Sequence, residues 1–294
     1  MRRRTEGPGI RLIAIDLDGT LLNSDRKIAP VTAAAIDRAA STGVRVILAT
    51  GRRYHAANPF ISALTLPGPH IVNDGALIVA AQGQPLWSRG ISPRGARRAL
   101  RVARTAGYSA VIYRHRLDGP DVFYQDEPQL PTFREYLASE GDRVRRVPDL
   151  LGFCDFPPEK ISIACPDEAA PGLRVALEAA AKGSYHLTVT AAPGGFKYVQ
   201  VVAATCSKGR ALRRLALMCG IARSQVAAIG DEENDLSMLE FAGVGVAMGN
   251  ARDEVKHRAR LVTGTNDDHG VAAALERLLC PGGTVRAGEG VSSG

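Results

Sequence analysis

Apolar runs and a helical pattern alternate through the first part of the chain. The segments 11–16, 44–50 and 70–74 are rich in Val, Ile and Leu, as buried strands are. Residues 31–42 have a helical pattern, and Pro30 is suited to its first turn. Continuous apolar strands separated by helices predict a parallel sheet that is covered on both faces.

The pattern changes after about Trp87. Residues 92–106 have a helical pattern, and the segments 109–115 and 121–125 flank the turn sequence Leu-Asp-Gly-Pro, which predicts a hairpin. The rest of this stretch alternates strand, helix and strand, at 160–165, 169–182 and 185–190. We predict a separate α+β domain here.

The first pattern then resumes. Ser207 can cap a helix that runs to Cys219, and apolar strands follow at 225–230, 243–248 and 260–264. The fold class predicted is α/β, with a Rossmann-like parallel sheet core and an inserted α+β domain. The predicted bounds are 10–87 and 196–280 for the core, 88–195 for the inserted domain, and 1–9 and 281–294 for flexible termini.

Length and composition fit a globular protein of about two domains, with 294 residues of which 45% are hydrophobic. No apolar run reaches the roughly 20 residues that span a bilayer, and no apolar stretch of a secretory signal follows the N-terminus. The cysteines are scattered and form no C-x-x-C pair, which is typical of reduced thiols: Cys154, Cys165, Cys206, Cys219 and Cys280. We expect a cytoplasmic protein with no membrane partner.

The net charge of +7 raises the question of a nucleic-acid partner. The densest basic patch is one arc of the helix predicted at 92–106, and it holds Arg94, Arg97, Arg98, Arg101 and Arg104. A solvated helix face explains this arc better than a nucleic-acid footprint, because neither interleaved aromatic residues nor a known nucleic-acid motif accompanies it. We therefore expect no nucleic-acid partner, and note that positive charge suits a small phosphorylated metabolite.

Four polar clusters follow predicted strands or begin predicted helices. They are Asp16 with Asp18, Thr50 with Gly51, Lys208, and the acidic run 230–235. On a strand, Asp16 and Asp18 would point the same way, since they are two residues apart. Each cluster alone is explained by a turn, a helix cap or a solvated lysine. Together they predict one site, because open α/β sheets bind ligands outside the carboxyl ends of their strands.

These residue types suit phosphoryl transfer. Asp16 would attack phosphorus and form an aspartyl-phosphate, while Asp18 would protonate the leaving oxygen and then deprotonate the hydrolytic water. A carboxylate and a phosphate dianion repel each other by about 8 kcal/mol at about 4 Å in an effective dielectric of about 20, so cations are required. Mg²⁺ fits this need, with Asp231 as a further ligand and Asp235 behind it.

The chain resembles the haloacid dehalogenase superfamily, and within it the Cof-type phosphatases with a large inserted cap domain. The resemblance is carried by IAIDLDGTLLNSD, LATGR, SKGRAL, GDEENDLSMLEFAGVGVAMGNA and VTGTNDDHGVA. It implies that the insertion at 88–195 is the cap domain, which sets substrate specificity.

The resemblance also implies catalytic and metal-binding roles. Asp16 would be both the nucleophile and a metal ligand. Asp18 would be the acid and base, and would bind the metal through its backbone carbonyl. Asp231 and Asp235 would complete the Mg²⁺ site.

Other residues of the four polar clusters are expected to bind phosphate. Lys208 at a helix start would neutralise phosphate oxygens, and Thr50 and Gly51 could donate hydrogen bonds. The resemblance adds Asn234, which would help to hold the phosphoryl group.

Three positions depart from the pattern that the family often shows. The sequence Asn-Asp-Gly-Ala begins at Asn73 where Asn-Gly-Ala is common, and this leaves the role of Asn73 unassigned. Glu232 stands where a small residue is frequent, and Gln200 stands near a frequent glutamate.

The predicted function is Mg²⁺-dependent hydrolysis of a small phosphorylated metabolite, with a sugar phosphate favoured. A phosphomutase of the same superfamily is the first alternative, since it would also use Asp16. A phosphate- or nucleic-acid-binding module without catalysis is the second, although such a module would gain nothing from pairing Asp16 with Asp18. The sequence contains no signal for the oligomeric state.

Overall fold

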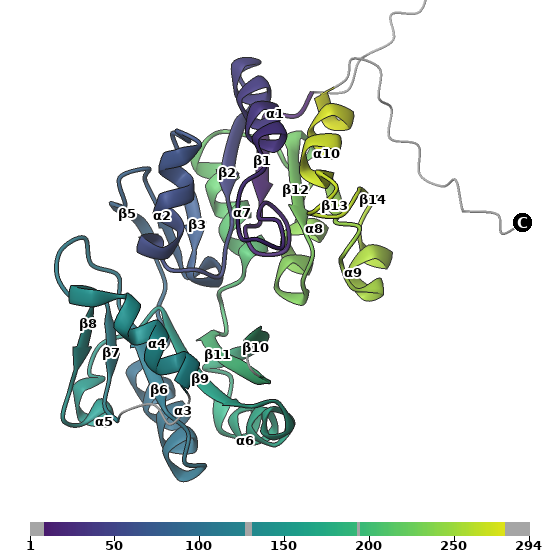
Figure 1. Ribbon diagram of the computed structural model, residues 1–294. Helices are drawn as coiled ribbons and strands as arrows, with labels where there is room; N and C mark the ends of the chain where they lie inside the picture. The colour runs from purple at the N-terminus through teal and green to yellow at the C-terminus, as the bar shows by residue number, and fades with distance from the viewer. Residues whose placement is uncertain (1–8, 127–130, 193–194, 280–294) are drawn as a thin grey trace, which may run out of the picture. The chain divides into compact units, whose positions relative to one another are not determined.

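The computed structural model describes residues 9–126, 131–192 and 195–279 (Figure 1). The chain forms two compact units. Unit 1 takes the residues up to Thr50, Ala57–Ile71 and the chain from Ser207, whereas unit 2 takes Gly51–Ala56 and Val72–Cys206. Cys280 and the termini predicted to be flexible, apart from Gly9, lie outside the described residues.

Unit 1 is built on a parallel sheet with the strand order β14-β13-β12-β1-β2. The strands are β1 (Leu12–Ile15), β2 (Arg45–Leu48), β12 (Val226–Gly230), β13 (Val244–Ala247) and β14 (Leu261–Val262). Most of their residues are buried, as the continuous apolar runs predict. The α/β fold with a parallel core is confirmed. Because β1 lies between β12 and β2, Ile15 is opposite both Ile229 and Leu48.

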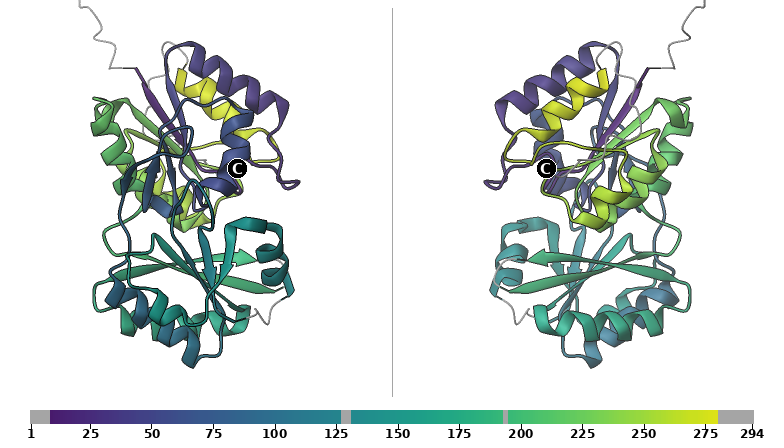
Figure 2. Two further views of the ribbon diagram at one scale, coloured as in Figure 1. Left: turned by 90° about the vertical axis from the view of Figure 1, so that its left-hand side faces the viewer. Right: turned by 90° about the vertical axis from the view of Figure 1, so that its right-hand side faces the viewer.

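Helices cover both faces of this sheet (Figure 2). α1 (Pro30–Ser41) and α10 (Gly270–Leu279) pack together on one face, and α7 (Lys208–Met218) and α8 (Leu236–Phe241) on the other. The first turn of α1 begins at Pro30, and the Ser207 hydroxyl caps α7 by accepting a hydrogen bond from the Arg210 amide at 3.2 Å. Both helices are predicted by these residues. Two further helices are α2 (Tyr54–Ala63) and α9 (Asp253–Arg258).

The prediction that residues 70–74 add a third strand to the core sheet is wrong. β3 (His70–Val72) forms a separate three-stranded sheet with β4 (Leu77–Val79) and β5 (Pro85–Ser88). Among the residues that the structure describes, one parallel bridge, between Ala49 and Ile71, connects β3 to the chain that follows β2. The physical reason is the turn η1 (Asn73–Gly75), whose three residues all have positive φ and lead the chain into β4.

Unit 2 contains a mostly antiparallel sheet with the strand order β10-β11-β9-β6-β7-β8. The strands are β6 (Ala110–Tyr113), β7 (Val122–Tyr124), β8 (Val144–Arg146), β9 (Lys160–Pro166), β10 (Tyr185–Ala192) and β11 (Phe196–Ala203). The predicted hairpin is confirmed, since β6 and β7 pair antiparallel with Tyr113 opposite Val122. β11 pairs with both β9 and β10, so unit 2 contains all of 88–195 and continues to Cys206.

The two faces of the unit 2 sheet pack against different helices. α3 (Pro93–Thr105), α5 (Leu150–Phe153) and α6 (Ala170–Ala181) share one apolar core with Ile112 of β6. α4 (Pro131–Ser139) packs through Phe133 and Leu137 against Val111 and Tyr113, the neighbours of Ile112 that face the other way. α3 and α6 match the predicted helices, whereas α4, α5, β8 and β11 were not predicted. Short 3-10 turns complete the chain: η2 (Gly141–Arg143), η3 (Asp167–Ala169), η4 (Arg223–Gln225) and η5 (Glu233–Asp235).

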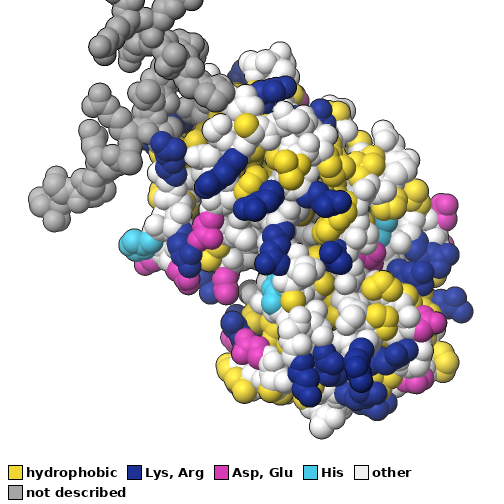
Figure 3. Space-filling model, turned by 180° about the vertical axis from the view of Figure 1, so that it is seen from behind, with side chains coloured by type: hydrophobic (Ala, Val, Ile, Leu, Met, Phe, Trp, Pro, Cys, Tyr) yellow, Lys and Arg dark blue, Asp and Glu magenta, His cyan; other side chains and the backbone are white. Residues whose placement is uncertain are grey.

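The basic arc of α3 is solvated only in part. Arg94, Arg101 and Arg104 are exposed, as expected. Arg98 instead donates hydrogen bonds to the carbonyls of Ala180 and Ala181, at the C-terminal end of α6. This interaction satisfies carbonyl groups that a helix end leaves unpaired. Basic side chains also gather elsewhere on the face of the molecule shown in Figure 3.

In the described part of the chain, no helix is both long enough and apolar enough to cross a bilayer. The cysteines in this part are free thiols, as expected: Cys154, Cys165, Cys206 and Cys219.

His70 is the one titratable residue of β3, and it is fully buried. Its Nδ1 accepts a hydrogen bond from the Leu48 amide at 3.2 Å, so the imidazole is neutral there. Burial lowers the pKa of His70 to about 4 from its ordinary value of 6.5. The unfolded chain therefore binds a proton between these two pH values that the folded chain does not.

We predict that the free energy of unfolding falls as the pH is lowered through this window. The His70 contribution is about 2 kcal/mol between about pH 7 and about pH 5. Urea denaturation of His70→Gln at both pH values should therefore show a smaller pH dependence than the wild-type protein. His257→Gln changes an exposed histidine and is the matched control. An unchanged pH dependence in His70→Gln would contradict the prediction.

Candidate active site

Asp16 directly follows the inner strand β1, at its carboxyl end. The Asp16 amide donates a hydrogen bond to the Ile229 carbonyl at 3.0 Å, and the Ala49 amide donates to the Ile15 carbonyl at 2.9 Å. The backbone hydrogen bonds of β1 to its neighbours β12 and β2 therefore continue up to Asp16. Asp16 is buried, with 5% of the residue exposed.

The turn that follows β1 presents Asp18 differently from Asp16. β1 ends at Ile15, so the alternation of a strand does not extend to Asp18, which is exposed. Gly19 has a φ of +77°, and a Cβ there would lie 2.3 Å from Oδ2 of Asp231. Only glycine allows both this conformation and this close approach. Thr20, one residue later, donates a hydrogen bond to Oδ1 of Asp231 at 2.6 Å.

Lys208 is the first residue of α7 and is almost completely buried, with 1% of its surface exposed. Its Nζ donates hydrogen bonds to Oδ1 of Asp16 and Oδ1 of Asp235, each at 2.6 Å. The next residue, Gly209, lies against α8, because a Cβ there would be 2.0 Å from the Ser237 carbonyl oxygen. This contact between α7 and α8 helps to hold Lys208 among the carboxylates.

The loop after β12 supplies two buried carboxylates. Asp231 is 7% exposed and Asp235 is 0% exposed. Oδ2 of Asp235 accepts hydrogen bonds from the amides of Asp231 and Glu232, at 3.0 and 3.1 Å. Asp235 therefore fixes the backbone of the loop while its other oxygen meets Lys208. Asn234, in the same loop, is half-buried.

The crowding of these acids changes their protonation. Burial raises the pKa of Asp16 well above its usual range, the Asp235 carboxylate raises it further, and the Lys208 ammonium lowers it. Burial, followed by the Asp235 charge, raises the pKa of Asp231 to about 7. A single ammonium is thus too little positive charge for three carboxylates.

The same three acids fit a divalent metal ion. Asp16, Asp231 and Asp235 are all buried, and one potential ligand atom from each lies within 4.8 Å of the others. Carboxylate oxygens are the ligands that Mg²⁺ takes in proteins, and a divalent cation would offset the excess negative charge. The donor set therefore suits the metal that the sequence predicts.

Thr50 lies at the same edge of the unit 1 sheet. It follows Ala49, whose amide pairs with the end of β1, and it is 1% exposed. Its own amide donates a hydrogen bond to the Ile71 carbonyl at 2.9 Å. Gly51 is the next residue and belongs to unit 2. Unit 1 thus brings together Asp16, Thr50, Lys208, Asp231 and Asp235.

Two residues that support the turn after β1 were missed by the sequence reasoning. Nδ2 of Asn250 donates a hydrogen bond to the Gly19 carbonyl at 2.8 Å, and Nδ2 of Asn266 donates to the Leu22 carbonyl at 2.9 Å. Both asparagines lie in segments that carry the family resemblance. Their place in these long matching segments was the one sequence signal that could have indicated a role for them.

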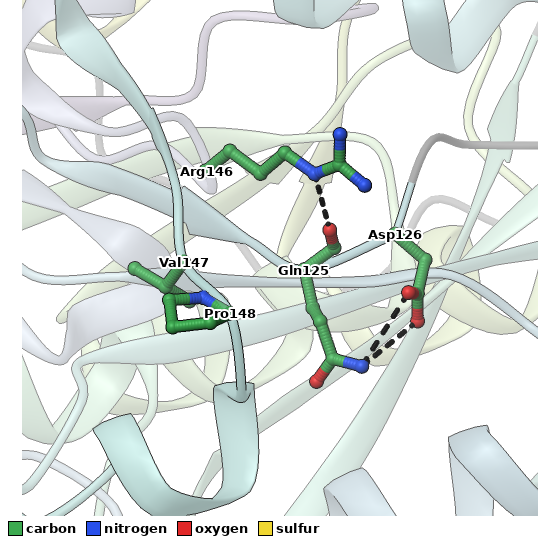
Figure 4. A pocket seen from close by; sticks show the side chains of 5 residues that line it. All are labelled: Gln125, Asp126, Arg146, Val147 and Pro148. Atoms are coloured by element: carbon green, nitrogen blue, oxygen red, sulfur yellow. Dashed lines mark hydrogen bonds between the residues drawn. The ribbon is translucent and has the colours of Figure 1, made fainter.

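Unit 2 contains a pocket of about 350 Å³ (Figure 4). Its described lining is Gln125, Asp126, Arg146, Val147 and Pro148. Nε of Arg146 donates a hydrogen bond to the Gln125 carbonyl at 2.9 Å, so the arginine is engaged in holding the backbone. None of the predicted site residues belongs to this lining, and the chemistry described above does not depend on it.

A model of the haloacid dehalogenase-like hydrolases matches residues 13–275 of the chain. The chain belongs to this family. Phosphatase YwpJ of Bacillus subtilis (strain 168) is 31% identical to this chain, over 92% of this chain and 100% of the relative. The pyridoxal phosphate phosphatase YbhA of Escherichia coli (strain K12) is also 31% identical, over 89% and 96% of the two chains.

A solved structure gives the same result for the fold. A haloacid dehalogenase-like hydrolase from Bacteroides thetaiotaomicron aligns with a TM-score of 0.78 and 28% identity, over 92% of this chain and 100% of that chain. The resemblance to Cof-type hydrolases is confirmed, and this hydrolase is a phosphatase.

We predict that Mg²⁺ raises the melting temperature of the hydrolase, since a ligand that binds only the folded state stabilises it. Asp231→Asn should lose most of this shift. Without metal, Asp231→Asn should be at least as stable as the wild-type protein, because it removes a charge beside Asp235. Scanning fluorimetry with and without MgCl₂ measures both effects. Glu254→Gln, at an exposed acid of α9, is the control, and a full Mg²⁺ shift in Asp231→Asn would contradict the assignment.

Proposed function

We propose that this phosphatase is Mg²⁺-dependent and hydrolyses a small phosphorylated metabolite, most favourably a sugar phosphate, through an aspartyl-phosphate. The observation that carries the proposal is the buried cluster in which Lys208 joins Asp16 to Asp235, next to Asp231, at the carboxyl edge of the parallel sheet. Buried charges of this density are rare unless chemistry requires them.

Asp16 is the proposed nucleophile. A carboxylate oxygen of Asp16 forms a bond to phosphorus while the bond from phosphorus to the ester oxygen breaks. The Lys208 ammonium favours the ionised form of Asp16 through its hydrogen bond to Oδ1. Lys208 is also close enough to the nucleophile to offset charge on the transferred group.

Asp18 is the proposed acid and base. It gives its proton to the ester oxygen as that bond breaks, and it then takes a proton from the water that attacks the aspartyl-phosphate. The exposed position of Asp18 supports this role, since an exposed carboxyl group exchanges protons readily with solvent.

Asp16, Asp231 and Asp235 would hold Mg²⁺ with their carboxylates, and Asp18 with its backbone carbonyl. The metal would neutralise the negative charge that otherwise opposes attack on a phosphate. Thr20 and the amides of the loop after β12 orient Asp231 and Asp235 through the hydrogen bonds described above.

Thr50, Gly51, Lys208 and Asn234 are the proposed phosphate-binding residues. Substrate preference is proposed to depend on the inserted cap domain at 88–195. The relative YbhA is named for pyridoxal phosphate, a small phosphate monoester, which supports this size class of substrate.

The proposal predicts hydrolysis of a generic aryl phosphate in the presence of Mg²⁺, with the loss of activity in excess chelator. The charge of the acidic cluster is the reason, because attack on a phosphate dianion needs a further cation. Release of the phenol is followed by absorbance, and excess MgCl₂ should restore activity after chelation. Full activity in excess chelator would contradict the metal requirement.

Substitutions of Asp16 and Asp18 should separate their roles. Asp16→Asn should reduce activity to background with every substrate, because an amide attacks phosphorus poorly. Asp18→Asn keeps the nucleophile, so it loses only proton transfers that are typically worth about 10² to 10⁴-fold. An activated aryl phosphate hardly needs protonation to leave, whereas an alkyl phosphate does.

Rapid mixing of Asp18→Asn with an aryl phosphate should give a burst of phenol followed by slow turnover, since breakdown of the aspartyl-phosphate still needs a base. Asp16→Asn should give no burst. Turnover by Asp16→Asn, with no trapped intermediate in Asp18→Asn, would show that Asp16 is not the nucleophile.

A further inference from the structure

The turn after β3 has consecutive residues with positive φ, and one of them is the buried acid Asp74. Asn73, Asp74 and Gly75 have φ values of 50°, 54° and 85°, so three consecutive residues are left-handed. Asn and Asp enter this region more readily than other side chains, yet two in succession are uncommon. The Asp74 side chain is buried, with 3% of the residue exposed. Strained backbone of this kind persists where surrounding contacts hold it in place.

Lys160 forms an ion pair with Asp74. It is the first residue of β9 and is 5% exposed. Its Nζ donates hydrogen bonds to Oδ2 of Asp74 at 3.3 Å and to the Gly51 carbonyl at 2.5 Å. All three residues belong to unit 2. The ammonium of this buried ion pair therefore also holds the backbone carbonyl of Gly51, the residue that follows Thr50.

Gly51 is held from two sides. A Cβ at Gly51 would lie 2.8 Å from Oδ1 of Asp74, so the carboxylate packs directly on the glycine backbone. The next carbonyl, that of Arg52, accepts a hydrogen bond from the Asn73 amide at 2.9 Å. Glycine is the residue with the greatest backbone freedom, and these contacts remove that freedom at Gly51.

We propose that Lys160 and Asp74 are positioning residues, which fix the backbone at Gly51 so that its amide group meets the phosphoryl group of the substrate. The inference rests on the proposed function, in which Gly51 binds phosphate. A peptide plane is rigid, so the hydrogen bond to the Gly51 carbonyl fixes the plane that this carbonyl shares with the Arg52 amide. The Asp74 carboxylate packs against the Gly51 Cα and so restricts the backbone rotations that orient the Gly51 amide. The role explains why the chain has an acid at Asp74, within the segment that departs from the family pattern.

Lys160→Met tests the proposal, since Met has a similar length but cannot donate a hydrogen bond. We expect KM for an aryl phosphate and the inhibition constant of inorganic phosphate each to rise about tenfold or more, with a smaller change in kcat. A purely structural ion pair would instead lower kcat through loss of folded enzyme and leave both constants unchanged. Lys197→Met is the control, because Lys197 pairs with Asp167 in the same unit and is more exposed.

Asp74→Asn is the second variant and decides the question if Lys160→Met does not fold. It keeps the shape and one oxygen acceptor for Lys160, so both constants should rise by less than in Lys160→Met but remain above wild-type values. Wild-type constants in a folded Lys160→Met, or in Asp74→Asn when Lys160→Met is unfolded, would overturn the positioning role and leave the phosphatase proposal intact. Absence of Mg²⁺-dependent hydrolysis by the wild-type enzyme would instead overturn the proposed function.

Discussion

The Lys208 ammonium lies between two carboxylates in the interior of unit 1, and much of the unit serves to keep it there. Removal of one partner from a buried ion pair typically destabilises a protein by about 3–5 kcal/mol, because the other charge is left uncompensated. Ser207 caps the helix that begins with Lys208, and Gly209 lets this helix approach α8. Asp235 is held by backbone amides on its other oxygen. The position of the charge is therefore set by packing as well as by attraction.

The strand order explains how distant residues meet at this point. Asp16 and Lys208 are 192 positions apart in the chain. β12 and β1 are neighbours and run parallel, so the loops that follow them emerge at the same edge of the sheet. The segment between β2 and β12 contains all of unit 2, and its length does not disturb this arrangement, because the register of β1 with β12 is fixed by buried residues.

Sequence patterns predicted those features that depend on a single strand or helix. The parallel strands followed from continuous apolar runs, and the convergence of Asp16 with Lys208 followed from their places at element ends. The exposure of Asp18 and the early end of β3 could not be read in this way, since both depend on positive φ values in turns. Lys160 began an apolar run and gave no signal of its own, because its partners at Gly51 and Asp74 are contacts that only the fold creates.

The pairing of β11 has a consequence for how the two units could be separated. Residues 196–203 hydrogen-bond to β9 on one side and β10 on the other, and Val199, Val201 and Val202 are fully buried there. Excision of 88–195 would leave this eight-residue strand without either neighbour. An apolar strand with two unpaired edges is a template for intermolecular pairing. A shortened enzyme cut at those positions would therefore aggregate, whereas a cut after Cys206 would remove the strand together with its sheet.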